Sequence, residues 1–292
     1  FYTNREDTIA KQDMTVELSR INLKEFRRIL PYMPDMEGWI GAEAHYIDSG
    51  PYMMVSSDLR IDEFKYEGSA LGNWELGGVY LPGEAKDHHL DAYIRHDGEE
   101  IAHLGGIYLP AEEGTGSLSA DIAFEHFPLN VANPFVPDRM VELDGDIDGT
   151  LSMKGDPAKP LLNGELALDS VTFFMPEMSA MFRFDNEPVQ VVNSKMMFKE
   201  FDIFTKGKTP FTINGEVDFS DLERTAVNLK MHAENYELLN APRTKRAMVY
   251  GKMYVDFNAT LRGPVEELVM RGNMNILGKT NVTYVLKDSP LT

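Results

Sequence analysis

Long stretches of alternating apolar and polar residues are the feature that most constrains the fold of this chain. Between Val141 and Met153, an apolar residue or a glycine occupies every second position, and acidic or hydroxyl side chains occupy the positions between them. A strand points successive side chains to opposite faces, so this spacing predicts a strand with one apolar and one polar face. The same alternation recurs in the segments 162–168, 227–233, 253–261 and 268–276.

These strands predict the fold class. We expect an all-β protein whose repetitive, elongated, antiparallel-rich sheet curls into an open hydrophobic trough, a β-taco-like shape, because an antiparallel sheet with one dry and one wet face requires this alternation. Very little helix is expected. The best candidate is 23–30, where Phe26, Ile29 and Leu30 share a face before Pro31 stops the helix, and we interpret it as a cap or clip on the sheet edge.

An irregular proline motif indicates a repeat. Pro-Tyr-Met-Pro at 31–34 recurs as Pro-Phe-Val-Pro at 134–137, 103 residues later, and a degraded copy lies at 240–242. A repeat architecture grows by stacking rather than by closing around one central site, which favours a protein that is not an enzyme. We predict one continuous elongated β-domain fragment over residues 1–292, with approximate repeat units 14–117, 118–226 and 227–292.

A shorter repeat contains paired glycines. Leu-Gly-Gly-Val-Tyr-Leu-Pro at 76–82 recurs as Leu-Gly-Gly-Ile-Tyr-Leu-Pro at 104–110. Paired glycines before β-branched and aromatic residues predict a bend or bulge that re-aims each strand. A phosphate-binding loop is disfavoured, because neither a helix start nor a lysine follows the glycines.

Charge and composition exclude some classes of partner. The chain has 47 acidic and 28 basic residues and a formal net charge of −19, which repels nucleic-acid phosphates. It has no cysteine, which is compatible with an oxidising compartment. No run approaches the roughly 20 apolar residues of a spanning helix. Because the chain opens on Phe1 rather than methionine, we expect it to be part of a longer protein, with any anchor outside it.

Catalytic and metal motifs are incomplete in this sequence. Asp-Gly-Asp-Ile-Asp-Gly at 144–149 matches the first half of a calcium loop, but Gly155 stands where the bidentate carboxylate is needed. Three aspartates on the wet face of a strand are the simpler interpretation. There is no Gly-x-Ser-x-Gly elbow. We predict no catalytic residue, no metal site and no cofactor. The histidines of this region, interpreted as exposed turn residues, are His88, His89, His96 and His103.

Methionine is frequent on the predicted dry face. The chain has 17 methionines, and Met231, Met253, Met270 and Met274 fall on that face. Flexible thioethers suit a surface that accommodates apolar ligands of variable shape. The alternative is that methionine fills a core between layers, and the residues alone leave both interpretations open.

Three consecutive motifs resemble a known family. They are Phe-Pro-Leu-Asn-Val-Ala-Asn-Pro-Phe-Val-Pro at 127–137, Leu-Asp-Gly-Asp-Ile-Asp-Gly-Thr-Leu-Ser-Met-Lys-Gly at 143–155 and Lys-Pro-Leu-Leu-Asn-Gly-Glu-Leu-Ala-Leu at 159–168. Together they resemble the C-terminal region of the TamB family of the AsmA-like superfamily. The matching positions are Gly149, Leu151, Gly155, Pro160, Leu162, Gly164 and Leu166, with a weaker second copy at Phe257, Leu261, Gly263, Leu268, Gly272 and Met274.

The resemblance implies a periplasmic part of a bridge-like lipid-transfer and outer-membrane biogenesis protein. The expected ligand is the acyl chains of phospholipids, the expected partner is an outer-membrane barrel of the Omp85/TamA type, and the whole protein is expected to be held in the inner membrane by an N-terminal helix. The residues expected to line the lipid groove are Leu143, Ile147, Leu151, Met153, Leu162, Leu166, Leu168, Met253, Val255, Phe257, Leu261, Met270, Met274 and Ile276.

Two other functions stay open. The first is a scaffold that assists insertion or assembly of outer-membrane β-barrel proteins through its strand edge. The second is a carbohydrate-binding or hydrolytic β-solenoid, for which Trp39, Trp74, Tyr80 and Tyr108 supply part of an aromatic ladder.

Overall fold

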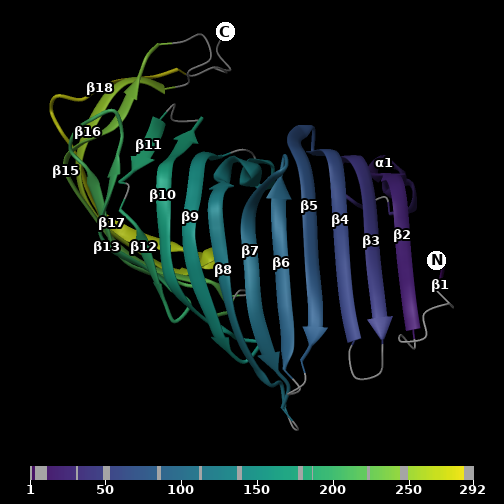
Figure 1. The fold of residues 1–292 in the computed structure, drawn as a ribbon. Helices are drawn as coiled ribbons and strands as arrows, with labels where there is room; N and C mark the ends of the chain where they lie inside the picture. The colour runs from purple at the N-terminus through teal and green to yellow at the C-terminus, as the bar shows by residue number, and fades with distance from the viewer. Residues whose placement is uncertain are drawn as a thin grey trace. The chain divides into compact units, whose positions relative to one another are not determined.

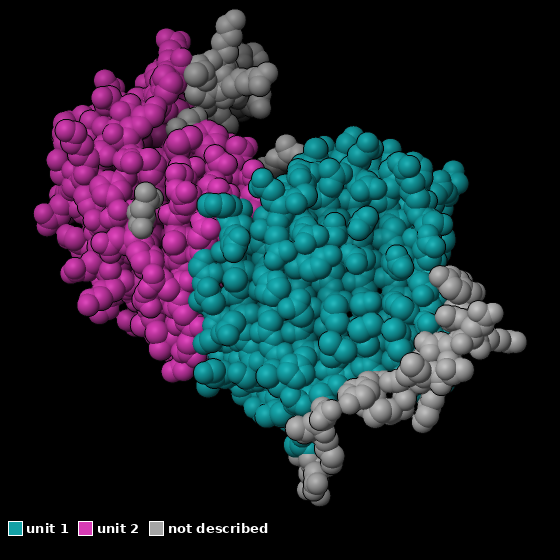
Figure 2. Space-filling model, in the orientation of Figure 1, with its two compact units in different colours: residues 1–127, 149–161 teal, residues 128–148, 162–292 magenta. Residues whose placement is uncertain are grey.

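The chain is an all-β protein, as predicted. The computed structural model describes residues 2–3, 12–30, 32–48, 53–83, 87–111, 114–136, 140–176, 180–185, 187–221, 224–243 and 249–285. It is 74% strand and 7% helix, and the strand pairings are antiparallel. The chain forms two compact units, which Figure 2 colours separately: unit 1 comprises residues 1–127 and 149–161, and unit 2 comprises 128–148 and 162–292.

Unit 1 is an antiparallel meander. Each strand from β1 to β7 pairs with the next one along the chain, and β2 to β8 follow one another in order (Figure 1). The strands are β1 (Tyr2–Thr3), β2 (Gln12–Asn22), β3 (Met36–Asp48), β4 (Met53–Tyr66), β5 (Ser69–Pro82), β6 (His88–His96), β7 (Glu99–Leu109) and β8 (Ser117–Pro128).

A short helix follows β2 in unit 1, where the sequence predicts one. This helix, α1 (Leu23–Ile29), begins after Asn22, whose side-chain oxygen accepts a hydrogen bond from the Lys24 N–H at 3.0 Å. Such a cap satisfies one of the backbone donors left free at a helix start. Leu23 is buried, so the helix is tied to the sheet by its first residue.

Unit 2 is also antiparallel, and its strands range from 4 residues in β12 to 16 in β15 and β16. Strands β9 and β10 each have residues in both units. Residues 149–155 of β9 and Leu161 of β10 belong to unit 1, and the rest of these two strands belongs to unit 2. The elements are η1 (Leu129–Phe135), β9 (Glu142–Gly155), β10 (Leu161–Met175), β11 (Ala180–Phe184), β12 (Val189–Val192), β13 (Lys195–Phe204), β14 (Phe211–Asp218), β15 (Ala226–Ala241), β16 (Val249–Pro264), η4 (Val265–Glu267), β17 (Val269–Ile276) and β18 (Asn281–Tyr284).

The hydrophobic core of unit 2 lies along one face of its strands. Phe182, Val189, Ile203 and Leu239 are all buried and belong to one cluster, to which β11, β12, β13 and β15 contribute. Directly paired residues of an antiparallel sheet share a face, so these rows of apolar side chains build one continuous dry surface. Within unit 2 the strands curl (Figure 1), and apolar residues of β10, β11 and β14 to β17 line one cavity.

Several strands carry a bulge of the same construction. Glu63, Glu200 and Asn235 have positive φ angles of 52°, 50° and 51°. In each case the backbone N–H of that residue donates to an asparagine or aspartate oxygen on the neighbouring strand, at 2.9, 2.9 and 2.6 Å. The unpaired donor that a bulge leaves is therefore satisfied by a side chain, which stabilises an otherwise unfavourable backbone conformation.

The paired glycines do not form bulges, so the bulge predicted there is wrong. The pairing of β5 with β6 and of β7 with β8 runs without a register shift through Gly77-Gly78 and Gly105-Gly106. At Gly77 a Cβ atom would lie 2.3 Å from the Tyr93 ring. The glycine therefore makes room for a neighbouring side chain.

The predicted strands are confirmed, and the domain description stays a prediction. The segments 162–168, 227–233 and 253–261 lie within β10, β15 and β16, and the segments 141–153 and 268–276 lie within β9 and β17 except for their first residues. One continuous β-domain with three repeat units remains a prediction beside the two units described. Pro31 and Pro137, one from each copy of the proline motif, lie outside the described residues.

Candidate functional site

The last strands of unit 2 present one apolar face. Strand register pairs Phe257 with Met274, Leu261 with Met270 and Val255 with Ile276. Because paired residues lie on the same face, these predicted groove residues share one side of β16 and β17. The row continues onto β15, where Ala233 pairs with Phe257 and Tyr236 with Val255.

An apolar cavity of about 540 Å³ lies on this face, wholly within unit 2. Its walls come from β10 and β11 on one side and from β14 to β17 on the other, which requires the sheet to curl around it. Most of the wall is aromatic, methionine or aliphatic, and none of its side chains is charged. The lining residues are Phe173, Met175, Phe182, Phe211, Met231, Tyr236, Leu238, Phe257, Ala259, Met270, Gly272, Asn273 and Met274.

Aromatic contacts fix the shape of the wall. Phe173 and Phe182 stack with their ring centroids 4.4 Å apart and 7° between the ring planes. Phe211 and Phe257 lie 5.2 Å apart with tilted rings. Such pairs add about 0.5–1.5 kcal/mol beyond the burial of their area, so these rings form a rigid part of the wall.

Two small residues create space in the cavity. Ala259 on β16 pairs with Gly272 on β17, so this row lacks large side chains. A Cβ atom at Gly272 would lie 2.6 Å from that of Ala259. The space between the Phe257–Met274 pair and the Leu261–Met270 pair therefore results from an alanine that lies opposite a glycine.

The cavity is open on the side of β17. Met270 and Met274 are 62% and 57% exposed, whereas Met231, in the wall on β15, is 8% exposed. All eight residues of β17 are exposed. Exposed methionines on a strand at the mouth of a cavity give a ligand a route of entry.

Some of the predicted groove residues line the cavity, and the others lie elsewhere in the two units. Phe257, Met270 and Met274 line the cavity, and so does Met231. Val255 is fully buried and Leu166 is 9% exposed. Leu143, Ile147, Leu162, Leu168, Met253, Leu261 and Ile276 also lie in unit 2 outside the cavity lining, and Leu151 and Met153 belong to unit 1.

Six further large side chains of the wall escaped sequence analysis, and so did Asn273. Phe173, Met175 and Phe182 lie in a Phe-rich stretch around the turn from β10 to β11, and aromatic density was the available signal there. Tyr236 and Leu238 do not continue the alternation of 227–233, because the bulge at Asn235 shifts the phase of β15. The sixth is Phe211, at the first position of β14.

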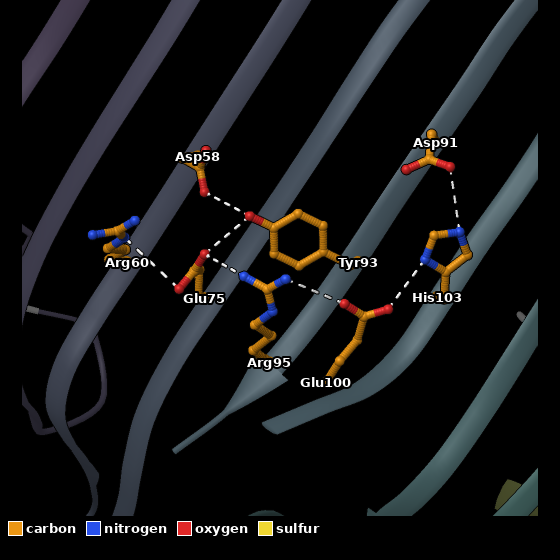
Figure 3. A network of polar contacts seen from close by, with 8 residues as sticks. All are labelled: Asp58, Arg60, Glu75, Asp91, Tyr93, Arg95, Glu100 and His103. Atoms are coloured by element: carbon orange, nitrogen blue, oxygen red, sulfur yellow. Dashed lines mark hydrogen bonds and ion pairs between the residues drawn. The ribbon is translucent and has the colours of Figure 1, made fainter. Parts of the chain in front are cut away.

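The polar face of unit 1 carries an extended charge network (Figure 3). Arg60, Glu75, Arg95 and Glu100 stand in one cross-strand row from β4 to β7 with alternating sign. Arg95 lies 3.3 Å from Glu75 and 3.4 Å from Glu100. Exposed pairs of this kind contribute little singly, and their regular alternation favours correct strand register.

Tyr93 ties this network to the next row (Figure 3). Its hydroxyl donates to Asp58 at 3.0 Å and to Glu75 at 2.9 Å. Desolvation, and then the hydrogen bonds to Glu75 and Asp58, raise the pKa of Tyr93 to about 12. The network holds neighbouring strands together, because the carboxylates of Asp58 and Glu75 both accept hydrogen bonds from protein donors.

The histidines begin or lie within strands, so their interpretation as turn residues is wrong. His88 and His89 are the first residues of β6, and His103 lies within β7. His103 contacts Asp91 at 3.3 Å and Glu100 at 3.2 Å. Among the described residues, no group of three or more histidine, aspartate or glutamate side chains is arranged to hold a metal ion.

The aromatics considered for a carbohydrate ladder pack against protein neighbours. The Trp74 ring lies 4.7 Å from that of His96. Tyr80 and Tyr108 flank His88 at 5.4 and 5.7 Å, and Tyr80 is hydrogen-bonded to it. These contacts account for the positions of three of the four aromatic residues.

Fold and cavity define the class: an all-β protein with an open apolar cavity on the inner face of a curled antiparallel sheet. No family model, curated protein or solved structure matches the chain. In the described segments, no helix has the length and apolar character to cross a membrane.

Proposed function

We propose that this chain holds the acyl chains of phospholipids in the cavity of unit 2 and shields them from water. In this proposal it is the periplasmic part of a bridge-like protein that transfers lipid between the inner and outer membranes and serves outer-membrane biogenesis. It works by binding and has no catalytic step. The observation that carries the proposal is the uncharged, largely apolar wall of a cavity that opens beside an exposed strand with methionines on one face.

Elementary energetics support a hydrocarbon ligand. Each methylene group withdrawn from water contributes about 0.8 kcal/mol, so a chain that buries several of them offsets much of the cost of leaving a bilayer. The cavity volume of about 540 Å³ falls in the range of small-molecule sites. Methionines at the mouth adapt their shape to different chains, since the thioether side chain is flexible.

Site-specific photo-crosslinking in cells that carry the full-length protein tests this proposal. A probe at Met274, in the cavity mouth, is compared with a probe at Arg271, on the same strand but on the polar face. We expect phospholipid adducts at Met274 and few at Arg271. Equal labelling of both positions, or protein adducts alone at Met274, would contradict a lipid-holding role.

The free edge of β17 favours a second candidate function. In the described part of the chain β17 pairs with β16, and its whole length is exposed. An apolar strand with unpaired backbone groups is a template for an incoming strand. The alternative proposal is a scaffold that assists insertion or assembly of outer-membrane β-barrel proteins at this edge, with an outer-membrane barrel of the TamA type as partner.

Backbone register supplies a sharp test of the alternative. The Leu277 N–H donates to the Tyr254 carbonyl oxygen, so by antiparallel alternation the N–H groups of residues 270, 272, 274 and 276 point to the free edge. Ile276→Pro therefore removes an outward donor without touching the cavity wall. Barrel assembly should fail in this variant under the scaffold hypothesis, whereas lipid crosslinking at Met274 should persist.

A further inference from the structure

A second cavity, of about 560 Å³, lies on the polar face of unit 2. Arg271 in its lining follows Met270 of the apolar cavity, and successive residues of a strand point to opposite faces, so the two cavities lie on opposite sides of β17. Four of its residues form one row across β14 to β17, each paired directly with the next: Asn214, Lys230, Thr260 and Arg271. The other lining residues are His232 and Asn258, together with Met231 and Ala259, which border both cavities.

The lining of this polar cavity is cationic. It contains no carboxylate, although the chain has 47 acidic residues. Lys230 and Arg271 are both exposed, and neither has an ion pair with any described residue. The nearest acidic side chains are engaged elsewhere, since Glu216 is held by Lys195 at 2.9 Å and Glu234 lies 3.7 Å from the His232 ring. Two positive charges are therefore left for a ligand.

The asparagines of the polar cavity have their acceptor oxygens occupied. The Asn214 side-chain oxygen accepts the Glu200 N–H at 2.9 Å. The Asn258 oxygen lies 2.6 Å from His232 Nδ1, which donates to it when that nitrogen carries the hydrogen. What each asparagine has left to offer a ligand is its NH₂ group, which only donates. Cations and amide donors together favour a ligand group that is an acceptor and carries negative charge.

The spacing of the row suits a phosphoryl group. Neighbouring strands lie about 4.8 Å apart, so the backbones of Lys230 on β15 and Arg271 on β17 are about 10 Å apart, with Thr260 between them. Both long side chains can reach a group placed above Thr260. A guanidinium binds two oxygens of a phosphate at once, and an ammonium acts as a point charge on a third. A carboxylate has only two oxygens, so it cannot occupy both cations and the amide donors as fully.

We propose that the polar cavity binds the phosphoryl group of a soluble phosphate monoester between Arg271 and Lys230. The site goes beyond the proposed lipid-holding function and is independent of it, because it uses the other face of the strands. The cavity volume falls in the range of small-molecule sites and leaves room for the group that carries the ester. The net charge of −19 repels an anionic bilayer surface, which favours a soluble ligand over the headgroup of a phospholipid.

Isothermal titration calorimetry with sn-glycerol 3-phosphate, inorganic phosphate and glycerol tests the proposal on the purified chain, at constant ionic strength set by NaCl. We expect both phosphates to bind and glycerol not to bind. Arg271→Gln should weaken sn-glycerol 3-phosphate about tenfold, because it removes a charged two-point contact, and Lys230→Gln about threefold. Lys252→Gln is the matched control. It removes the same charge from an exposed position of β16 outside the cavity lining, so the affinity should stay within about twofold.

Three results would overturn the proposal. An equal loss of affinity in Lys252→Gln and Arg271→Gln would mean that net charge alone attracts the ligand. Sedimentation of the wild-type chain with phosphatidylglycerol vesicles, abolished by Arg271→Gln, would assign the site to a lipid headgroup instead of a soluble ligand. A wild-type chain that binds neither phosphate would exclude the site and leave lipid holding to be decided by crosslinking at Met274. The circular dichroism spectrum of Arg271→Gln should match the wild type, since the substituted side chain is exposed.

Discussion

At the scale of single residues, space made by glycine decides how the polar face of unit 1 is built. The Tyr93 ring lies over Gly77, and its hydroxyl reaches Asp58 and Glu75 from there. Arg95 lies over the same ring at 4.3 Å from its centroid, an additional cation–π contact. Three strands thus meet around one aromatic side chain whose position depends on a missing Cβ atom.

Gly77→Ala should therefore destabilise unit 1 by about 1–3 kcal/mol, because the added methyl group displaces a packed ring. Chemical unfolding followed by tryptophan fluorescence measures it, since Trp39 and Trp74 both lie in unit 1. Gly105→Ala is the control: its Cβ would meet nothing nearer than 3.8 Å, so it should be neutral or stabilise by about 0.5–1 kcal/mol. Equal effects of the two substitutions would show that ring displacement is not the cause.

Residue-level detail also limits what the sequence could predict. Alternation identified Phe257, Met270 and Met274 in the cavity wall, because β16 and β17 keep a regular register there. It failed at Tyr236, where a bulge changes the phase, and no local sequence signal distinguishes a bulge at Asn235 from an ordinary strand end. The bulge predicted at the paired glycines is wrong for a related reason. The side chain that fills the space above Gly77 comes from the neighbouring strand, so the local sequence does not reveal it.

At the scale of elements, β15 anchors unit 2. It pairs along its length with β16 and also with β14, and Met231, Ala233, Tyr236 and Leu239 are buried along it. The regular part of this ladder, up to Ala233, is visible as alternation in the sequence, whereas Tyr236 and Leu239 follow register shifts and are not. The curl that brings β10 and β17 to one cavity is not visible either, because it arises from packing among strands distant in the chain.

Leu239→Ala should destabilise unit 2 by about 2–5 kcal/mol, the usual cost of a cavity left by truncating a core leucine. Leu239 is 1% exposed and belongs to the main core cluster. Urea unfolding followed by circular dichroism measures the change. Leu268→Ala, at a position that is 40% exposed, should cost under about 1 kcal/mol and serves as the comparison. A similar loss in both variants would argue against a core role for β15.

At the scale of the whole molecule, charge is unbalanced. The formal net charge of −19 opposes compaction by repulsion among carboxylates, while the ion pairs of the polar face contribute only modestly. Composition alone predicts this property. How the acidic residues are partitioned between strand faces follows from alternation, which is why fold class and surface character were the most predictable features of the chain.

Raising NaCl from about 0.01 M to about 0.15 M should raise the melting temperature, because the Debye length falls from about 30 Å to about 8 Å and repulsion is screened. KCl at the same ionic strength should act equally. A fall in melting temperature would mean that ion-pair rows such as Glu75–Arg95–Glu100 outweigh the net repulsion.

The methionines at the cavity mouth have a consequence for the lifetime of the protein. Met270 and Met274 are more than half exposed, and peroxide converts an accessible thioether into a polar, chiral sulfoxide. Such a change would wet the cavity entrance while every strand stayed in place. Under oxidative stress the proposed affinity of the cavity for hydrocarbon would be lost long before the fold, and reduction by a sulfoxide reductase would restore it.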